Sequence, residues 1–97
     1  MKIMFKCHSA DTVPVFISGN HPALGEWDTG RAMAMQLQTD SNGGCEWTAV
    51  LDLEPGRTLE YKFVKKGDNG FTKWENGWNR SYTAVPGIGS ISDAFRT

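Results

Sequence analysis

The 97-residue chain carries a formal net charge of −1, and 39% of its residues are hydrophobic and 22% charged. This length suits one domain (residues 1–97) with a single modest core, and the composition is ordinary for a globular chain and unlike that of a disordered one. A charge so near zero excludes a general electrostatic attraction to nucleic acid or to anionic lipid. No apolar run approaches the roughly 18 residues of a membrane span, and the N-terminal residues lack the apolar segment of a signal peptide.

The two cysteines, Cys7 and Cys45, lie far apart in the sequence and match no CxxC spacing of a metal or redox site. Cys7 shares a strand face with Ile3 and Phe5, which favours a buried free thiol over a disulfide. A free thiol favours a reducing compartment, so we expect a cytoplasmic location. The two histidines join no recognisable metal-ligand or catalytic set, and we expect neither a metal nor any other cofactor.

Alternating apolar and polar residues predict a series of short strands separated by turns. The segments expected as strands are residues 1–8, 13–18, 32–38, 47–53, 59–65, 71–74, 82–85 and 91–95. The side chains expected to face the core are Ile3, Phe5, Cys7, Val13, Val15, Ile17, Met33, Met35, Leu37, Ala49, Leu51, Leu53, Leu59, Tyr61 and Phe63. Turns are expected at residues 39–44, 68–70 and 86–87, and Pro14 should lie at a strand start or on an edge because it lacks an N–H. Because no helical segment alternates with these strands, we predict an antiparallel sandwich or barrel.

The segment 71–82, FTKWENGWNRSY, departs from this alternation. It places Trp74 and Trp78 among charged and amide side chains, with Gly77 between them to bend the backbone. An indole offers an apolar face to the C–H groups of a sugar ring, and polar neighbours offer donors and acceptors to its hydroxyls. The alternative from composition alone is a Trp-rich turn whose indoles plug one end of a β core.

Four motifs follow one another along the chain: VFISGNHPALGEW at 15–27, LEYKFVK at 59–65, KWENGWNRSYTAVPG at 73–87 and ISDAFR at 91–96. In this order and spacing they make the chain resemble, almost end to end, the starch-binding domains of carbohydrate-binding module family 20. These domains are appended to amylases, glucoamylases and some phosphatases and phosphodiesterases. The resemblance implies an antiparallel immunoglobulin-like β-sandwich of seven to eight strands. It also implies non-catalytic binding of α-1,4-linked glucans, namely starch, glycogen, maltooligosaccharides and cyclodextrins.

The resemblance further implies a first sugar site made by Trp27, Lys62, Trp74, Glu75 and Asn79. Two indoles held at an angle would match the curved apolar face of an α-1,4-glucan, and the lysine and asparagine would bind its hydroxyls. Each residue has an alternative role: Trp27 and Trp74 as core plugs, and Lys62 as a solvated lysine. Glu75 either contacts sugar or fixes the loop through Arg80 or a backbone amide, and Arg80 is expected to be structural.

The second sugar site of the family corresponds here to Trp47. The tyrosines expected beside it are replaced by Asp11 and Asp40, and Trp47 shares its alternation with Ala49, which favours partial burial. This second site is therefore weakened, rebuilt or lost. Trp78 is an addition within the main motif, and it either widens the first platform or covers the loop.

Three other function classes are alternatives. One is a sandwich kept for protein contacts after sugar binding was lost, and the presence of Trp27, Lys62, Trp74 and Asn79 argues against it. An enzyme would need a pair of carboxylates, for which Asp28 and Glu75 are the candidates near the aromatics. A single-stranded nucleic-acid binder would use the interleaved basic and aromatic residues Lys62, Phe63, Lys65, Lys66, Phe71, Lys73 and Trp74. The expected partners are an α-glucan and a catalytic domain of the same parent protein, not nucleic acid or a membrane.

Overall fold

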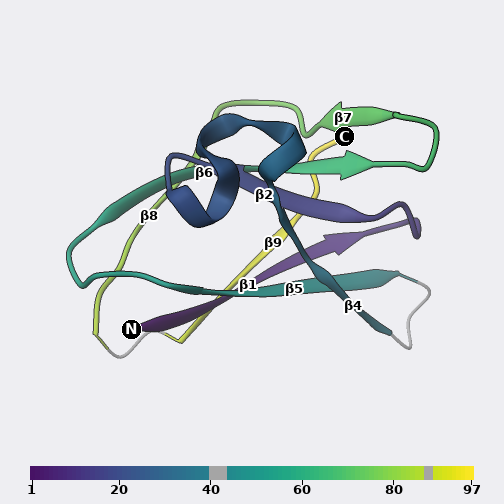
Figure 1. Cartoon of the computed structure of the whole chain (residues 1–97). Coiled ribbons are helices and arrows are strands. Elements are labelled where there is room, and N and C mark those ends of the chain that lie inside the picture. The colour runs from purple at the N-terminus through teal and green to yellow at the C-terminus, as the bar shows by residue number, and fades with distance from the viewer. Residues whose placement is uncertain (40–43, 87–88) are drawn as a thin grey trace.

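The computed structural model describes residues 1–39, 44–86 and 89–97. It is a sandwich of two β-sheets (Figure 1). The first sheet has the strand order β4 (Gln36–Thr39), β5 (Cys45–Asp52), β1 (Lys2–Ser9) and β9 (Ser90–Ala94). The second has the order β3 (Met33–Ala34), β2 (Val15–Gly19), β6 (Thr58–Lys66) and β7 (Thr72–Trp74), and β8 (Arg80–Thr83) pairs with the first half of β6. Two short 3₁₀ helices, η1 (Pro22–Trp27) and η2 (Thr29–Arg31), follow β2, and η1 packs against it.

The predicted all-β sandwich is confirmed, with two differences in detail. The described residues contain nine strands rather than seven or eight, because the strand expected at 32–38 is divided at Met35. The N–H of Met35 donates to the Val15 carbonyl of the second sheet at 3.0 Å, whereas Leu37 pairs with Trp47 in the first sheet. The chain therefore crosses from one sheet to the other at Met35. The pairs are antiparallel except β1 with β9, which is parallel.

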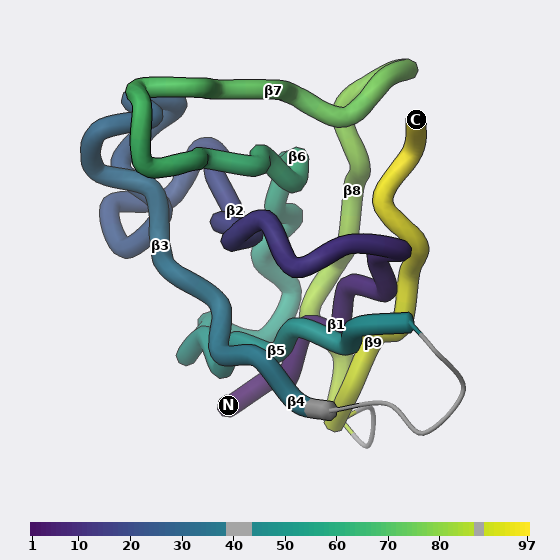
Figure 2. Tube along the Cα trace, turned by 90° about the vertical axis from the view of Figure 1, so that its right-hand side faces the viewer, coloured from purple at the N-terminus to yellow at the C-terminus, as the bar shows by residue number. Residues whose placement is uncertain are grey.

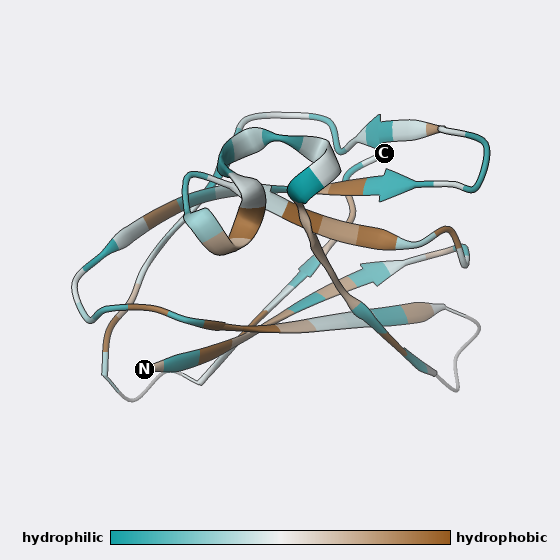
Figure 3. Cartoon of the chain, viewed as in Figure 1, coloured by the Kyte–Doolittle hydropathy of each residue, from teal (hydrophilic) through white to brown (hydrophobic). Residues whose placement is uncertain are grey.

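Aromatic rings from both sheets meet in the core between them. Phe5 of β1 packs edge to face on Tyr61 of β6, with ring centroids 5.1 Å apart, and Tyr61 packs in the same way on Phe63 at 5.8 Å. Edge-to-face contacts are a favourable geometry for aromatic pairs. Hydrophobic segments lie along the central strands of both sheets (brown in Figure 3), and their inward side chains close the sandwich.

Most of the side chains predicted to face the core are buried. Those less than a tenth exposed are Ile3, Phe5, Cys7, Val15, Ile17, Met35, Leu51, Leu53, Leu59, Tyr61 and Phe63, whereas Val13, Met33 and Ala49 are half-buried. Leu37 shares the inner face with its strand partner Trp47, but it is not buried as expected, because β4 is an edge strand and Leu37 is 45% exposed. Val64 is fully buried although it points to the outer face of β6. Its antiparallel partner on that face is Trp74, so this part of the outer face is covered as well.

The Gly/Asn/Pro-rich connection at residues 19–27 contains η1. Pro22 stands at its start, and His21 Nδ1 accepts a hydrogen bond from the N–H of Ala23 at 3.0 Å. A 3₁₀ helix this short has no periodicity that a sequence pattern can reveal. Pro14 directly precedes β2, as predicted. The turn at 68–70 joins β6 to β7, whereas residues 40–43 and 87 of the other two predicted turns lie outside the described residues.

Cys7 is a buried free thiol, as predicted, and Cys45 is a half-buried one. Within the described residues, no group of three or more His, Cys, Asp or Glu side chains is placed to hold a metal ion. Over the same ranges, no helix is long and apolar enough to cross a membrane.

The buried thiol yields a prediction about reactivity. Burial raises the pKa of the Cys7 thiol to about 12, so only about one thiol in 10⁴ is ionised at pH 8. In a Cys45→Ser variant, we expect a thiol reagent to modify native Cys7 at least about 100-fold more slowly than the urea-unfolded chain. A Cys7→Ser variant, which leaves Cys45, is the control and should react faster in the native state. Rapid native modification of Cys7 would show that β1 opens readily.

Candidate functional site

The two indoles predicted to form a platform lie together. The ring centroids of Trp27 and Trp74 are 6.4 Å apart, and the ring planes are tilted by 45°. Both side chains are half-buried, and neither belongs to the buried core cluster. The pair is therefore a surface feature rather than a plug at the end of the core, and its two ring planes are inclined to each other.

The backbone around Trp27 is built to hold this position. Gly25 has φ +76°, and a Cβ at this position would lie 2.6 Å from the backbone of Arg31, so only glycine fits. Glu26 and Trp27 also have positive φ, at 51° and 71°. Each such non-glycine residue costs about 1 kcal/mol or more. Backbone strain of this kind persists where surrounding contacts impose it, and it concentrates at functional sites.

The outer face of β6 provides those contacts. Lys66 donates from Nζ to the carbonyl of Thr29, two residues after Trp27, at 2.7 Å. Val64, two residues back along β6, is paired with Trp74 of β7. Alternate residues of one strand thus fix the segments that carry both indoles, which explains how two residues far apart in the sequence come to share one surface.

Lys62 continues the same outward row but is not the free cation that we expected. Its Nζ donates to the carbonyl of Gly77 at 3.0 Å and so anchors the loop between β7 and β8. An ammonium group can donate three hydrogen bonds, so this contact uses one of them. Asn79, in the same loop, is exposed to solvent.

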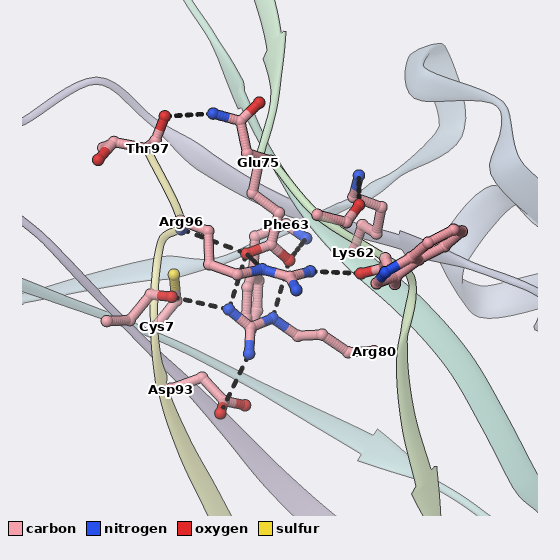
Figure 4. A network of polar contacts seen from close by, with 12 residues as sticks. Cys7, Lys62, Phe63, Glu75, Arg80, Asp93, Arg96 and Thr97 are labelled. Atoms are coloured by element: carbon pink, nitrogen blue, oxygen red, sulfur yellow. Dashed lines mark hydrogen bonds and ion pairs between the residues drawn. The ribbon is translucent and has the colours of Figure 1, made fainter.

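Glu75 lies beneath the platform rather than on its surface. Its side chain is fully buried, and Figure 4 shows the guanidinium groups of both Arg80 and Arg96 next to its carboxylate. Arg80 donates to both carboxylate oxygens at 2.8 Å, and the N–H of Phe63 donates to Oε2 at 3.0 Å. Two roles were expected as alternatives for Glu75, and the contacts in the structure are those of the loop-fixing role.

The pKa of Glu75 reflects this environment. Burial by itself would raise the pKa of the carboxyl group, but the hydrogen bonds from Arg80, Phe63 and Arg96 outweigh it and hold the pKa below its ordinary value. Arg80 also pairs with Asp93 at 3.2 Å. The carboxylate therefore stays ionised in the folded protein, and Arg80 is structural, as expected.

Sequence reasoning missed the contribution of the C-terminal residues. Arg96 donates from Nε to Glu75 Oε1 at 3.3 Å and from Nη2 to the carbonyl of Trp78. Asn76 donates from its N–H to the carbonyl of Arg96 at 3.0 Å and from its side chain to that of Thr97. Figure 2 shows the yellow C-terminal end beside the green loop that follows β7. No local sequence pattern predicts these contacts, because they join residues about twenty positions apart.

Trp78 is 89% exposed. The interpretation in which this indole covers the loop is therefore wrong. Trp47, proposed for a second site, is only 6% exposed and pairs with Cys7 and Leu37 in the first sheet. Its ring faces the core, which agrees with the expected burial and leaves no indole face for stacking at that position.

The residues that replace the expected tyrosines offer no substitute platform. Asp11 forms an ion pair with Lys65 at 3.1 Å, and the bonds from Lys65 and the Val13 N–H lower its pKa against the opposing effect of burial. Asp40 lies outside the described residues.

The nucleic-acid-binding and enzyme alternatives both need side chains that are buried or already engaged in the structure. For a nucleic-acid stacking face, Phe63 and Lys65 are buried, and Lys66 is engaged with the Thr29 carbonyl and lies 4.3 Å from the ring centroid of Phe16. For a carboxylate pair, Glu75 is enclosed by arginines, and Asp28 accepts from the N–H of Gly30 at 2.9 Å.

A sequence model of the starch binding domain family (CBM_20) matches residues 1–92 of this chain. The chain belongs to that family. The resemblance drawn from the four motifs is thereby confirmed, and the starch-binding domain is a binding module rather than a catalytic one.

Larger enzymes carry relatives of this starch-binding domain. The AA13 family lytic polysaccharide monooxygenase A of Aspergillus terreus is 41% identical over 73 residues, which cover 75% of this chain and 18% of that protein. The cyclomaltodextrin glucanotransferase of Bacillus sp. (strain 1-1) is 32% identical over 87 residues, which cover 87% of this chain and 12% of that enzyme. The chain thus spans less than a fifth of either relative.

The fold agrees with solved structures of the same family. The family 20 carbohydrate-binding module of a maltotetraose-forming amylase from Pseudomonas saccharophila STB07 has a TM-score of 0.75 and 26% identity, with 98% of this chain and 100% of that chain covered. The glycoside hydrolase family 15 glucoamylase from Hypocrea jecorina gives 0.83 and 25%, with 99% of this chain and 17% of that chain covered. This starch-binding domain therefore matches one isolated module in extent.

The buried carboxylate yields a stability prediction. Glu75→Gln keeps the size of the side chain but removes the charge that Arg80 and Arg96 share. We expect it to lower the free energy of unfolding by about 2–4 kcal/mol in urea titrations at pH 7. Glu54→Gln, an exposed glutamate, is the matched control and should change it by less than about 0.5 kcal/mol. Equal effects of the two substitutions would contradict the role given to Glu75.

The same carboxylate predicts a pH dependence. A folded-state pKa below the ordinary value stabilises the protein above the unfolded pKa of about 4.3, and this stabilisation is lost as the pH falls through the folded value. The wild type should therefore lose stability below about pH 4, and Glu75→Gln should show a shallower loss over that range. Thermal unfolding at a series of pH values measures this. Parallel curves for the two proteins would refute it.

Proposed function

We propose that this domain binds α-1,4-linked glucans, including starch, glycogen, maltooligosaccharides and cyclodextrins, on the Trp27–Trp74 pair. The observation that carries the proposal is the geometry of that pair, with centroids 6.4 Å apart and planes tilted by 45°. A curved glucan turns the apolar faces of successive sugar rings towards two inclined surfaces, whereas coplanar indoles suit a straight chain. The proposed ligand class follows from this angle together with the membership of the starch binding domain family.

The polar groups around the pair take the sugar hydroxyls in this proposal. Lys62 keeps donor capacity beyond its bond to Gly77, and exposed Asn79 offers both a donor and an acceptor. Glu75 contributes from below by fixing the loop. Since Trp47 faces the core, the proposal assigns it no sugar contact.

The expected affinity is modest. Each stacked indole removes roughly 80–100 Å² of apolar surface from water, which corresponds to about 2–2.5 kcal/mol. Hydrogen bonds that compete with water add about 0.5–1.5 kcal/mol each, and the cost of association offsets part of this gain. A dissociation constant between roughly 10 µM and 1 mM follows.

Binding of this strength suits tethering. A module that holds an attached enzyme on a polysaccharide raises the effective concentration of that enzyme without adding chemistry of its own. The relatives of this domain are modules of larger amylolytic enzymes. We therefore include a catalytic domain of the same parent protein as a partner in the proposal.

Truncating an indole tests the proposal. We expect Trp74→Ala and Trp27→Ala each to weaken binding of β-cyclodextrin by about 30-fold, because each removes one stacking surface worth about 2 kcal/mol. Isothermal titration calorimetry measures the affinity, and circular dichroism confirms that the variants are folded.

Val50→Ala is the matched control, because Val50 is an apolar side chain, 49% exposed, on the other sheet. It should leave the affinity within about twofold. Binding that survives both tryptophan substitutions would refute the proposed site. Steeply salt-dependent binding to a single-stranded oligonucleotide, without binding to β-cyclodextrin, would favour the nucleic-acid alternative instead.

A further inference from the structure

We propose that Trp78 is a third stacking surface in line with Trp27 and Trp74, which makes the domain selective for glucan chains longer than the pair alone can hold. Arg96 is the residue that positions it. This inference rests on the proposed function of the Trp27–Trp74 pair and extends it to a preference for ligand length.

The first observation is the exposure of the indole. Trp78 is 89% exposed, whereas the other exposed large hydrophobic side chains of the described residues, Leu37, Val50, Phe71 and Val85, lie between 38% and 50%. Trp27 and Trp74 are half-buried. An indole this exposed is stabilised little by packing in the unbound domain. A ligand that covers it therefore removes most of the apolar surface of the ring from water.

The second observation is that the backbone at Trp78 is held from both sides. Lys62 binds the carbonyl of Gly77 at 3.0 Å, and Arg96 binds the carbonyl of Trp78 itself. Gly77 has φ +91°, and a Cβ there would lie 2.7 Å from Nη1 of Arg96. The guanidinium group thus occupies the space that any larger residue would need. The indole therefore projects from a fixed backbone, and ordering it on a ligand costs little beyond its own side-chain rotation.

The third observation places the loop in line with the pair. Three alternate residues of β6 hold the three indole-bearing segments: Lys66 binds the carbonyl of Thr29 just after Trp27, Val64 pairs with Trp74, and Lys62 binds the residue before Trp78. Alternate residues of a strand are about 7 Å apart. This step is close to the 6.4 Å between the first two rings.

The order of these anchors along β6 sets the order of the indoles. The segment of Trp74 is held between the segments of Trp27 and Trp78, so a glucan lying on the first two indoles is directed towards the third at one of its ends. A ligand that ends on the pair does not reach Trp78, whereas a longer one does. Trp78 therefore contributes to the affinity for long chains and not to the affinity for short ones.

Binding of maltotriose and maltoheptaose to the full chain tests the inference. We expect Trp78→Ala to weaken maltoheptaose binding about 10-fold and to leave maltotriose binding within about twofold, in titrations followed by calorimetry. Trp78→Phe keeps an aromatic face and should retain most of the maltoheptaose affinity. Arg96→Gln should also weaken the binding of maltoheptaose more than that of maltotriose. A general loss of stability would not produce this selective change.

The outcomes separate this inference from the proposed function. If Trp78→Ala weakens both ligands equally, or neither of them, the third surface is refuted while the pair stands. If Trp74→Ala leaves the binding of both ligands unchanged, the proposed function itself fails. Phe71→Ala, which truncates another exposed aromatic residue on the β6–β7 connection, is the matched control and should change neither affinity; an equal loss there would overturn the assignment to Trp78.

Discussion

The rest of the candidate site depends on the hydrogen bonds that the buried carboxylate of Glu75 accepts. It follows Trp74 directly, and it accepts hydrogen bonds from Phe63 of the central strand, from Arg80 at the start of β8 and from Arg96 near the C-terminus. An ionised carboxylate is stable without water only when its lone pairs are satisfied in this way. One charge therefore fixes a strand end, a loop and a terminal segment in a single arrangement beneath the Trp27–Trp74 pair.

The second constraint is the outer face of β6. One strand carries Lys62, Val64 and Lys66 on that face, and each of them fixes a different segment of the chain by a hydrogen bond or by strand pairing. The rigid sheet sets the spacing, and loops that would otherwise move are tied to it. Under the proposed function, this ordering by the sheet precedes the arrival of the ligand and lowers the entropic cost of binding.

A consequence of these two constraints is that the polar residues of segment 73–87 act at different depths. Glu75 and Arg80 lie beneath the platform and hold it, while Asn79 remains exposed beside it. Lys62 belongs to both levels, since one of its donors anchors the loop. In the first sheet, Trp47 belongs to the core and offers no exposed ring face for stacking.

The sequence by itself determined the all-β class, most of the inward-facing residues and the family, because alternation and short motifs are local properties of the chain. It also brought Trp27 and Trp74 together, but through the resemblance and not through any spacing. Only the tertiary structure decided that Glu75 is buried, that Lys62 anchors a loop, that the chain crosses between sheets at Met35 and that Arg96 supports the site. These features arise from contacts between distant segments, and the hydrogen-bond partner of a side chain depends on the packing of the whole sandwich and not on its neighbours in sequence.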